Sequence, residues 1–122
     1  DAAKGMANSG VVGAWNYNMA FLYCYNGDFV RAIRHYRKAA NIAVKPNIIV
    51  QVEDFMCWVL SQEPEKYHIN YGLGFFNWKT KGDVIQASKD FEAFLNTGSD
   101  EEFSKERKLA QQWMQDMPEP SS

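Results

Sequence analysis

Apolar residues recur along this chain at intervals of three and four positions, which is the period of an amphipathic helix. The stretch 83–96 shows the pattern clearly, with Val84, Ala87, Phe91 and Phe94 on one face. Gly, Pro and Asp residues interrupt the pattern about every 14–18 positions, and segments of that length suit helices better than strands. The sequence therefore predicts six helices, at residues 13–26, 29–43, 48–62, 65–81, 83–96 and 100–117.

Two of the interruptions are Gly-Asp pairs, which have the composition of a helix end followed by a helix start. Gly27 and Gly82 can adopt the left-handed conformation that closes a helix. Asp28 and Asp83 can accept a hydrogen bond from the first turn of the next helix. Both pairs therefore predict sharp connections between consecutive helices.

The length of the chain limits it to one folded domain. With 122 residues and a mass of 14.0 kDa, two independent cores would be difficult to build. We expect a segment at 1–12 that is weakly ordered or the end of a preceding helix, a helical domain at 13–117 and a disordered tail at 118–122. The chain opens at Asp1 without an initiator Met, so we interpret it as a processed protein or as a piece of a longer one.

Residues 15–39 and 70–91 resemble each other. Each segment consists of an aromatic helix, a Gly-Asp turn and a second helix with Ala four residues after the Asp and an aromatic residue four further on. Small residues let two helices approach closely, and aromatic side chains fill the spaces beside them. The similarity therefore predicts two copies of one helical hairpin.

This pattern resembles the tetratricopeptide repeat family over roughly residues 13–117. The resemblance implies an all-α solenoid of antiparallel helical hairpins, with about three degenerate repeats stacked as a right-handed superhelix. In that family a small residue of the first helix meets a small residue of the second, and large aromatic residues follow. The matching helix-packing positions are Ala20, Tyr23, Ala32, Tyr36, Ala39, Gly74, Ala87 and Phe91.

Two repeat frames remain open. The residue match places both Gly-Asp turns inside hairpins and leaves the helix at 48–62 as an insertion. The family period of about 34 residues instead gives repeats at 13–46, 47–80 and 81–114. The two frames disagree over which side of the helix at 65–81 faces the groove.

Aromatic residues make up 15% of the chain. They surround more than one face of the first and fourth predicted helices, so we expect some of them to be exposed. In the tetratricopeptide family, the first helices of each pair line a concave groove that binds an extended peptide or a helix. The resemblance implies such a peptide-binding groove, lined by Tyr17, Asn18, Phe21, Tyr25, Tyr71, Phe75 and Trp78. Packing against adjoining helices is the alternative for each residue.

Residues that could carry catalysis are few. His35 and His68 are the only histidines, no cluster has metal-ligand spacing, and neither a nucleophile elbow nor a phosphate loop occurs. We therefore expect no enzymatic activity, no cofactor and no metal. The formal charge of −2 gives no basic footprint for nucleic acid. No apolar run reaches the roughly 18–20 residues that span a bilayer, so we expect neither nucleic-acid binding nor membrane insertion.

Cys24 and Cys57 are too few for a disulfide framework. Both lie in apolar helical stretches, so burial as small hydrophobic side chains is the preferred interpretation. A single disulfide or an exposed thiol is the alternative. The compartment stays open, and a reducing, cytoplasmic one is favoured.

The sequence thus predicts a non-catalytic module, part of a larger protein, that binds a peptide or helix of a protein partner in an aromatic-rich concave groove. Self-association is one alternative, because a short stack leaves its ends exposed and a homodimer would cover them. An accessory domain of a multidomain enzyme is the other.

Overall fold

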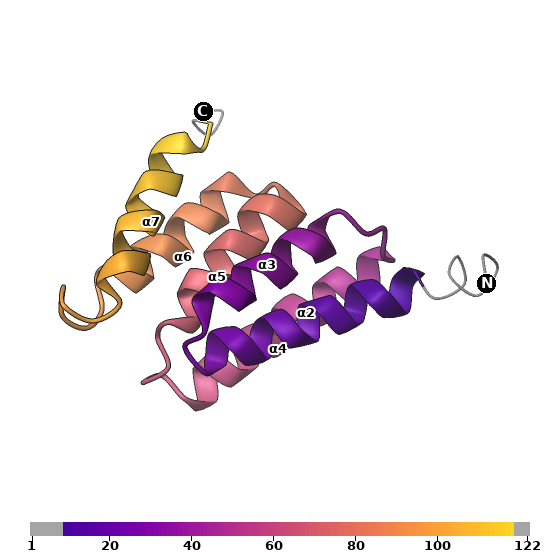
Figure 1. Cartoon of the computed structure of the whole chain (residues 1–122), viewed down its shortest axis with the longest axis horizontal. Coiled ribbons are helices and arrows are strands. Elements are labelled where there is room, and N and C mark those ends of the chain that lie inside the picture. Colours follow the sequence, from indigo (N-terminus) through magenta and orange to yellow (C-terminus); the bar gives the residue numbers. More distant parts are fainter. Residues whose placement is uncertain (1–8, 119–122) are drawn as a thin grey trace.

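The computed structural model describes residues 9–118, and in this range it contains α-helices, one π-helical segment and no strands (Figure 1). The predicted all-α class is therefore confirmed. The six α-helices are α2 (Ser9–Tyr25), α3 (Phe29–Ala40), α4 (Pro46–Gln62), α5 (Ile69–Phe76), α6 (Val84–Leu95) and α7 (Ser104–Asp116). The π-helix η1 (Asn77–Lys81) continues α5 directly.

Several helix ends differ from the predicted ones. Residues 65–68 form turns, so α5 begins at Ile69. Helix α7 begins only at Ser104, because Phe103 takes a left-handed conformation with φ 53°. Helix α2 begins at Ser9, four residues before the predicted helix start at 13. The rest of the segment predicted at 1–12, and the predicted tail beyond residue 118, lie outside the described residues.

The two Gly-Asp turns have nearly the same backbone geometry. Gly27 and Gly82 have φ 82° and φ 66°, in the left-handed region that favours glycine. Asp28 and Asp83 follow with φ −91° and −90°. The carboxylate of each Asp accepts a hydrogen bond from the backbone N–H three residues later, at 3.4 and 3.1 Å. Both turns therefore cap the start of the following helix, as predicted.

Among the described residues, the most extensive contacts between helices are those of α2 with α3 and of α5 with α6. These are the two pairs that the Gly-Asp turns join. Helix α5 lies between α3 and α6 and also contacts α2. Helix α4 runs along α2 and touches α5, and α7 packs on α6 (Figure 1). Helix α4 thus lies between the two pairs in the sequence and packs beside them in space.

Small residues stand where the paired helices meet. Gly74 has no room for a side chain, because a Cβ atom there would lie 2.6 Å from the ring of Phe91. Tyr23 is half-buried and stacks on His35, with ring centroids 5.4 Å apart. The other predicted packing residues are all buried, namely Ala20, Ala32, Tyr36, Ala39, Ala87 and Phe91.

The π-helix explains a difference in length between the hairpins. Eight positions separate Gly74 from Gly82, whereas seven separate Ala20 from Gly27. A π-turn holds one more residue than an α-turn. In η1 the backbone N–H groups of Gly82 and Asp83 both donate to the carbonyl of Asn77. The π-turn thereby accommodates the extra residue, and the second hairpin has the same type of turn between its helices as the first.

A buried arginine closes the C-terminal end of α6. The guanidinium of Arg107, from α7, donates to four backbone carbonyls and one hydroxyl, and three of those carbonyls lie at or just after the end of α6. It therefore ties α7 to the second hairpin. Its acceptors are the carbonyls of Phe94, Leu95, Thr97 and Glu102 and the hydroxyl of Tyr67, at 2.6–3.3 Å.

Candidate functional site

Helix α4 lies against the face of α2 that the sequence predicted to be an open groove. Phe55 of α4 packs edge-to-face on Phe21 of α2, with ring centroids 5.3 Å apart. The hydroxyl of Tyr25 donates a hydrogen bond of 2.6 Å to Glu63, just after the end of α4. Only two residues of α4, Met56 and Val59, are buried. The contact is therefore narrow, and most of α4 stays accessible.

A cavity of about 170 Å³ remains open between the two helices, and we call it the α2–α4 seam. Tyr17 and Met56 form its buried part, whereas the side chains of Asn18 and Gln51 are exposed at its mouth. The seam is therefore apolar inside and carries amide groups at its edge. Its lining is Ala14, Tyr17, Asn18 and Phe21 from α2 and Ile48, Gln51, Val52, Phe55 and Met56 from α4.

Exposed aromatic side chains extend the α4 wall of the seam. Phe55, which belongs to the lining, and Trp58 are 50% and 59% exposed, and their rings stack 6.3 Å apart. On α2, Trp15 and Leu22 are more than half exposed, but neither belongs to the lining. The ring of Trp15 instead packs edge-to-face on His35 of α3, with centroids 5.6 Å apart. The exposure of the α4 pair was not predicted. The available signal was that apolar residues occur all round this helix, more than one buried face needs.

Four of the seven residues predicted to line a groove lie along α2, and three of these line the seam. Tyr17, Asn18 and Phe21 belong to its lining. Tyr25 is half-buried beyond it, with the ammonium group of Lys66 4.4 Å from its ring centre. Of these four, only Asn18 is exposed, because α4 covers the aromatic face of α2.

Tyr71 and Phe75 do not join them, and the prediction of a shared groove is wrong for these two residues. Helix α5 lies between the hairpins, so every residue from 71 to 77 is buried. Both rings pack on Trp113 of α7, with centroids 5.3 and 5.2 Å away. Trp78 is half-buried against the same Trp113. These residues form the core between α5 and α7.

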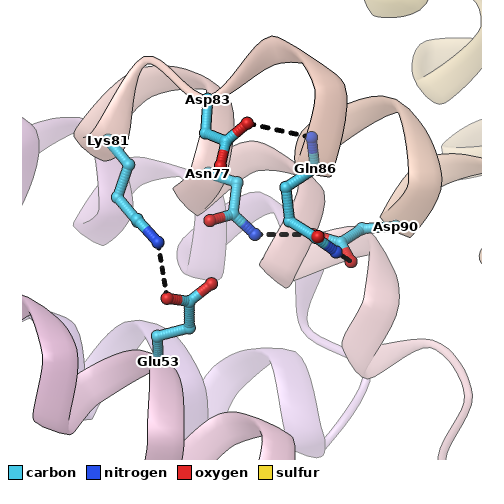
Figure 2. A network of polar contacts seen from close by, with 6 residues as sticks. All are labelled: Glu53, Asn77, Lys81, Asp83, Gln86 and Asp90. Carbon is cyan, nitrogen blue, oxygen red and sulfur yellow. Dashed lines mark hydrogen bonds and ion pairs between the residues drawn. The ribbon is translucent and has the colours of Figure 1, made fainter.

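A polar network surrounds η1 (Figure 2). Asn77 and Gln86 donate hydrogen bonds of 2.6 and 2.9 Å to the two carboxylate oxygens of Asp90. Burial raises the pKa of Asp90, and the two hydrogen bonds oppose that rise. Lys81 donates a charge-assisted hydrogen bond of 2.6 Å to Glu53, which joins η1 to α4. The network thus holds the second hairpin together and ties it to the inserted helix.

Asn77 and Asp90 were not predicted to interact. Asn77 is buried because the π-turn places it toward α6, and its Oδ1 accepts no hydrogen bond from the described residues. The sequence signal was the additional residue between Gly74 and Gly82, which indicates a change in helix type.

The remaining candidate groups have structural surroundings. Burial raises the pKa of Cys24 to about 12, so it stays a thiol at neutral pH. Cys57 is exposed, so the preferred prediction of burial is wrong for this residue and the alternative of an exposed thiol holds. No three His, Cys, Asp or Glu residues within 9–118 are grouped as metal ligands. None of the helices described has both the length and the hydropathy needed to cross a bilayer.

Comparisons with protein-family models, with curated proteins and with solved structures gave no significant match. The resemblance to the tetratricopeptide repeat family therefore rests on the residues quoted above, and the function must be argued from the site itself.

Proposed function

We propose that this chain is a non-catalytic protein–protein interaction module that binds an apolar segment of a partner along the α2–α4 seam. The observation that carries the proposal is an open, largely apolar cavity whose α4 wall presents the exposed, stacked aromatic side chains of Phe55 and Trp58. Such residues concentrate binding energy at protein interfaces. Asn18 and Gln51 at the mouth offer amide groups to the polar atoms of a ligand.

The proposal includes a stacking of the two hairpins like that of the tetratricopeptide family, as a short right-handed superhelix. The matching Gly-Asp turns and the small residues at both helix contacts support it. In this arrangement α4 is an insertion that lies on α2 and α5, the helices whose counterparts bind ligands in that family. The ligand site then moves outward from the hairpins to the α2–α4 seam.

An amphipathic helix fits the seam better than an extended strand. The residues of its two walls recur at helical spacing, as Ala14, Tyr17 and Phe21 on α2 and as Ile48, Gln51 and Phe55 on α4. Neither wall offers a strand edge for backbone pairing. A partner helix lying between the two rows would satisfy its own backbone and present side chains at intervals of three and four.

The test uses peptides selected against the full chain from a random display library. We expect the selected peptides to carry apolar residues at helical spacing. The double substitution Phe55→Ala and Trp58→Ala should weaken their binding at least tenfold, or by about 1.4 kcal/mol. Both side chains are half-exposed, so circular dichroism should show an unchanged helical content.

Ile85→Ala is the matched control, because Ile85 is a similarly exposed apolar residue (52%) on α6. Its affinity for the peptides should equal that of the unsubstituted chain. Equal affinity of all three proteins would contradict the proposal. A concentration-dependent dimer that the double substitution dissociates, seen by sedimentation, would support self-association instead.

A further inference from the structure

We infer that a second groove, between α3 and α7, is a docking surface for an acidic amphipathic helix of a protein partner. A cavity of about 240 Å³ lies between these two helices, and we call it the α3–α7 groove. It shares no residue with the α2–α4 seam. The groove therefore represents a separate surface with a chemistry of its own.

The inside of the α3–α7 groove is apolar. Val30 and Ile33 of α3 form one wall, Leu109 of α7 forms the other, and the rings of Tyr71 and Trp113 contribute buried lining. Val30 is 59% exposed, so a considerable apolar area there has no partner within the described residues. The lining residues Val30, Ile33 and Arg37 on α3, and Glu106, Leu109 and Trp113 on α7, follow intervals of three and four, which places one face of each helix along the groove.

The edges of the groove are cationic. Arg37 and Lys105 belong to its lining, against a single carboxylate, that of Glu106. Arg34 and Lys108 are exposed on the same two helices. Within residues 9–118 none of these four cations has a carboxylate within 4.0 Å. Because the whole chain has a formal charge of −2, this group is a local reversal of sign, and a ligand with carboxylates would complement it.

The hydroxyl of Tyr71 adds a polar group to the lining of the groove. The Tyr71 side chain is almost entirely buried. No hydrogen bond within the described part of the chain involves its hydroxyl, and this oxygen is not among the fully buried atoms without a partner. The hydroxyl is therefore open to a ligand in the groove, and a carboxylate entering beside Arg37 would accept a hydrogen bond from it.

These observations together define the occupant. Apolar side chains on one face of a helix would fill the space between Val30 and Leu109, and carboxylates beside them would reach Arg37, Lys105 and Tyr71. A nucleic acid would match the cations but not the apolar walls, so the groove favours a protein ligand.

The probe is a synthetic helical peptide of about four turns, with Leu on one face and Glu on both sides of it. The control peptide has Lys in place of every Glu. At low salt the Glu peptide should bind the full chain and the Lys peptide should not, and added salt should weaken the binding. Equal binding of the two peptides, or binding of neither, would overturn the inference.

Charge reversal in the chain tests the location. Arg37→Glu together with Lys105→Glu should weaken the Glu peptide at least tenfold, whereas Lys89→Glu, an exposed change on α6, should have no effect. Lys105→Glu alone keeps the test valid if Arg37, whose guanidinium lies 5.4 Å from the ring centre of Phe75, proves necessary for folding. An equal loss with Lys89→Glu would show that only net charge matters and would overturn the inference.

Other occupants give distinct outcomes. A single-stranded oligonucleotide that displaces the Glu peptide would assign the groove to nucleic acid. A dimer that Lys105→Glu dissociates would assign it to a second copy of this chain, and either result overturns the inference. The substitutions Phe55→Ala and Trp58→Ala should leave binding of the Glu peptide unchanged, because they lie in the α2–α4 seam, so the two proposals can fail separately.

Discussion

The two helical hairpins of this chain, α2–α3 and α5–α6, contain turns of the same geometry, but the first helix of each hairpin leads into its turn in a different way. Helix α2 runs to its turn in regular α-helical geometry, whereas α5 passes through the π-turn of η1, which holds one more residue. That π-turn directs Asn77 into the second hairpin, where it binds Asp90 (Figure 2). The comparison shows that the second hairpin accommodates its one additional residue inside the first helix, while the turn and the contacts between the helices are the same in both hairpins.

The hairpins also differ in how they are covered. The first hairpin meets α4 along a narrow contact and keeps exposed apolar residues such as Trp15 and Leu22. In the second, α5 is covered on several sides, and its aromatic residues are buried against α7. Exposed apolar surface marks interaction sites, so the difference places the seam we propose for binding beside the first hairpin.

The largest expected effect comes from breaking the polar contact that the π-turn creates. Asp90→Ala leaves the buried amide of Asn77 without an acceptor, and we expect it to lower the free energy of unfolding by about 2–3 kcal/mol. The matched change is His35→Ala, because both residues lie seven positions after the Asp of their turn and both bind an Asn. His35 is only half-buried, so its loss should cost less. Urea unfolding measures both, and equal costs would contradict this account.

A smaller effect should come from the small residues that let the helices meet. Gly74→Ala forces a Cβ atom against the ring of Phe91. Overpacking costs about 1–3 kcal/mol, and the helix preference of Ala returns about 1 kcal/mol, so we expect a net loss of about 1–2 kcal/mol. Adding Phe91→Leu to Gly74→Ala should recover part of it, which urea unfolding of the double variant would show. A gain in stability from Gly74→Ala alone would show that the ring can move aside.

The helix caps should show the similarity of the two turns. Asp28→Ala and Asp83→Ala each remove a side-chain acceptor from the first turn of a helix, and each should cost about 1 kcal/mol. Thermal unfolding of the two variants should give the same shift in Tm. A cost confined to one of the two would mean that the turns differ in strength despite their common geometry.

The smallest expected effect is a dependence on pH through His68, which joins the hairpins by a hydrogen bond of 3.0 Å to the carbonyl of Tyr25. Burial lowers the pKa of His68, and the charge of Lys66 acts in the same direction, while that hydrogen bond opposes both. The unfolded chain therefore binds the proton more tightly than the folded one. Stability should be fully present above the ordinary value of 6.5 and should fall as the pH drops through it.

His68→Gln keeps a donor for the Tyr25 carbonyl and removes the titration. Unfolding measured from pH 8 to pH 5 should give a flatter curve for the variant than for the unsubstituted chain. The half-buried His35, whose pKa burial also lowers, would account for the slope that remains. An unchanged slope in the variant would exclude His68 as its source.

Local features were predictable from the sequence. The Gly-Asp turns were found because a glycine with positive φ and a capping Asp are adjacent in the chain. The helices were found because their buried faces repeat every three or four residues, as in α6. The contact of Gly74 with Phe91 was also within reach, since both positions matched those of the first hairpin.

Features that depend on contacts between distant segments were not predictable. The spacing of apolar residues over 65–81 does not show that 65–68 form turns or that the helix changes type at Asn77. Helix α4 has no marker of the face it covers, so Tyr17 and Phe21 were expected to be open. Tyr71 and Phe75 look like surplus aromatic residues until α5 is seen to lie between two hairpins.

Helix α4 competes with any free ligand for the aromatic face of α2. A short loop joins it to α3, so it faces α2 as a tethered ligand whose effective concentration is on the order of millimolar or higher. A free peptide of moderate affinity for the same aromatic face would be outcompeted at ordinary cellular concentrations. By holding its own helix over Tyr17 and Phe21, the chain would limit ligands of the proposed site to those that recognise the two helices together.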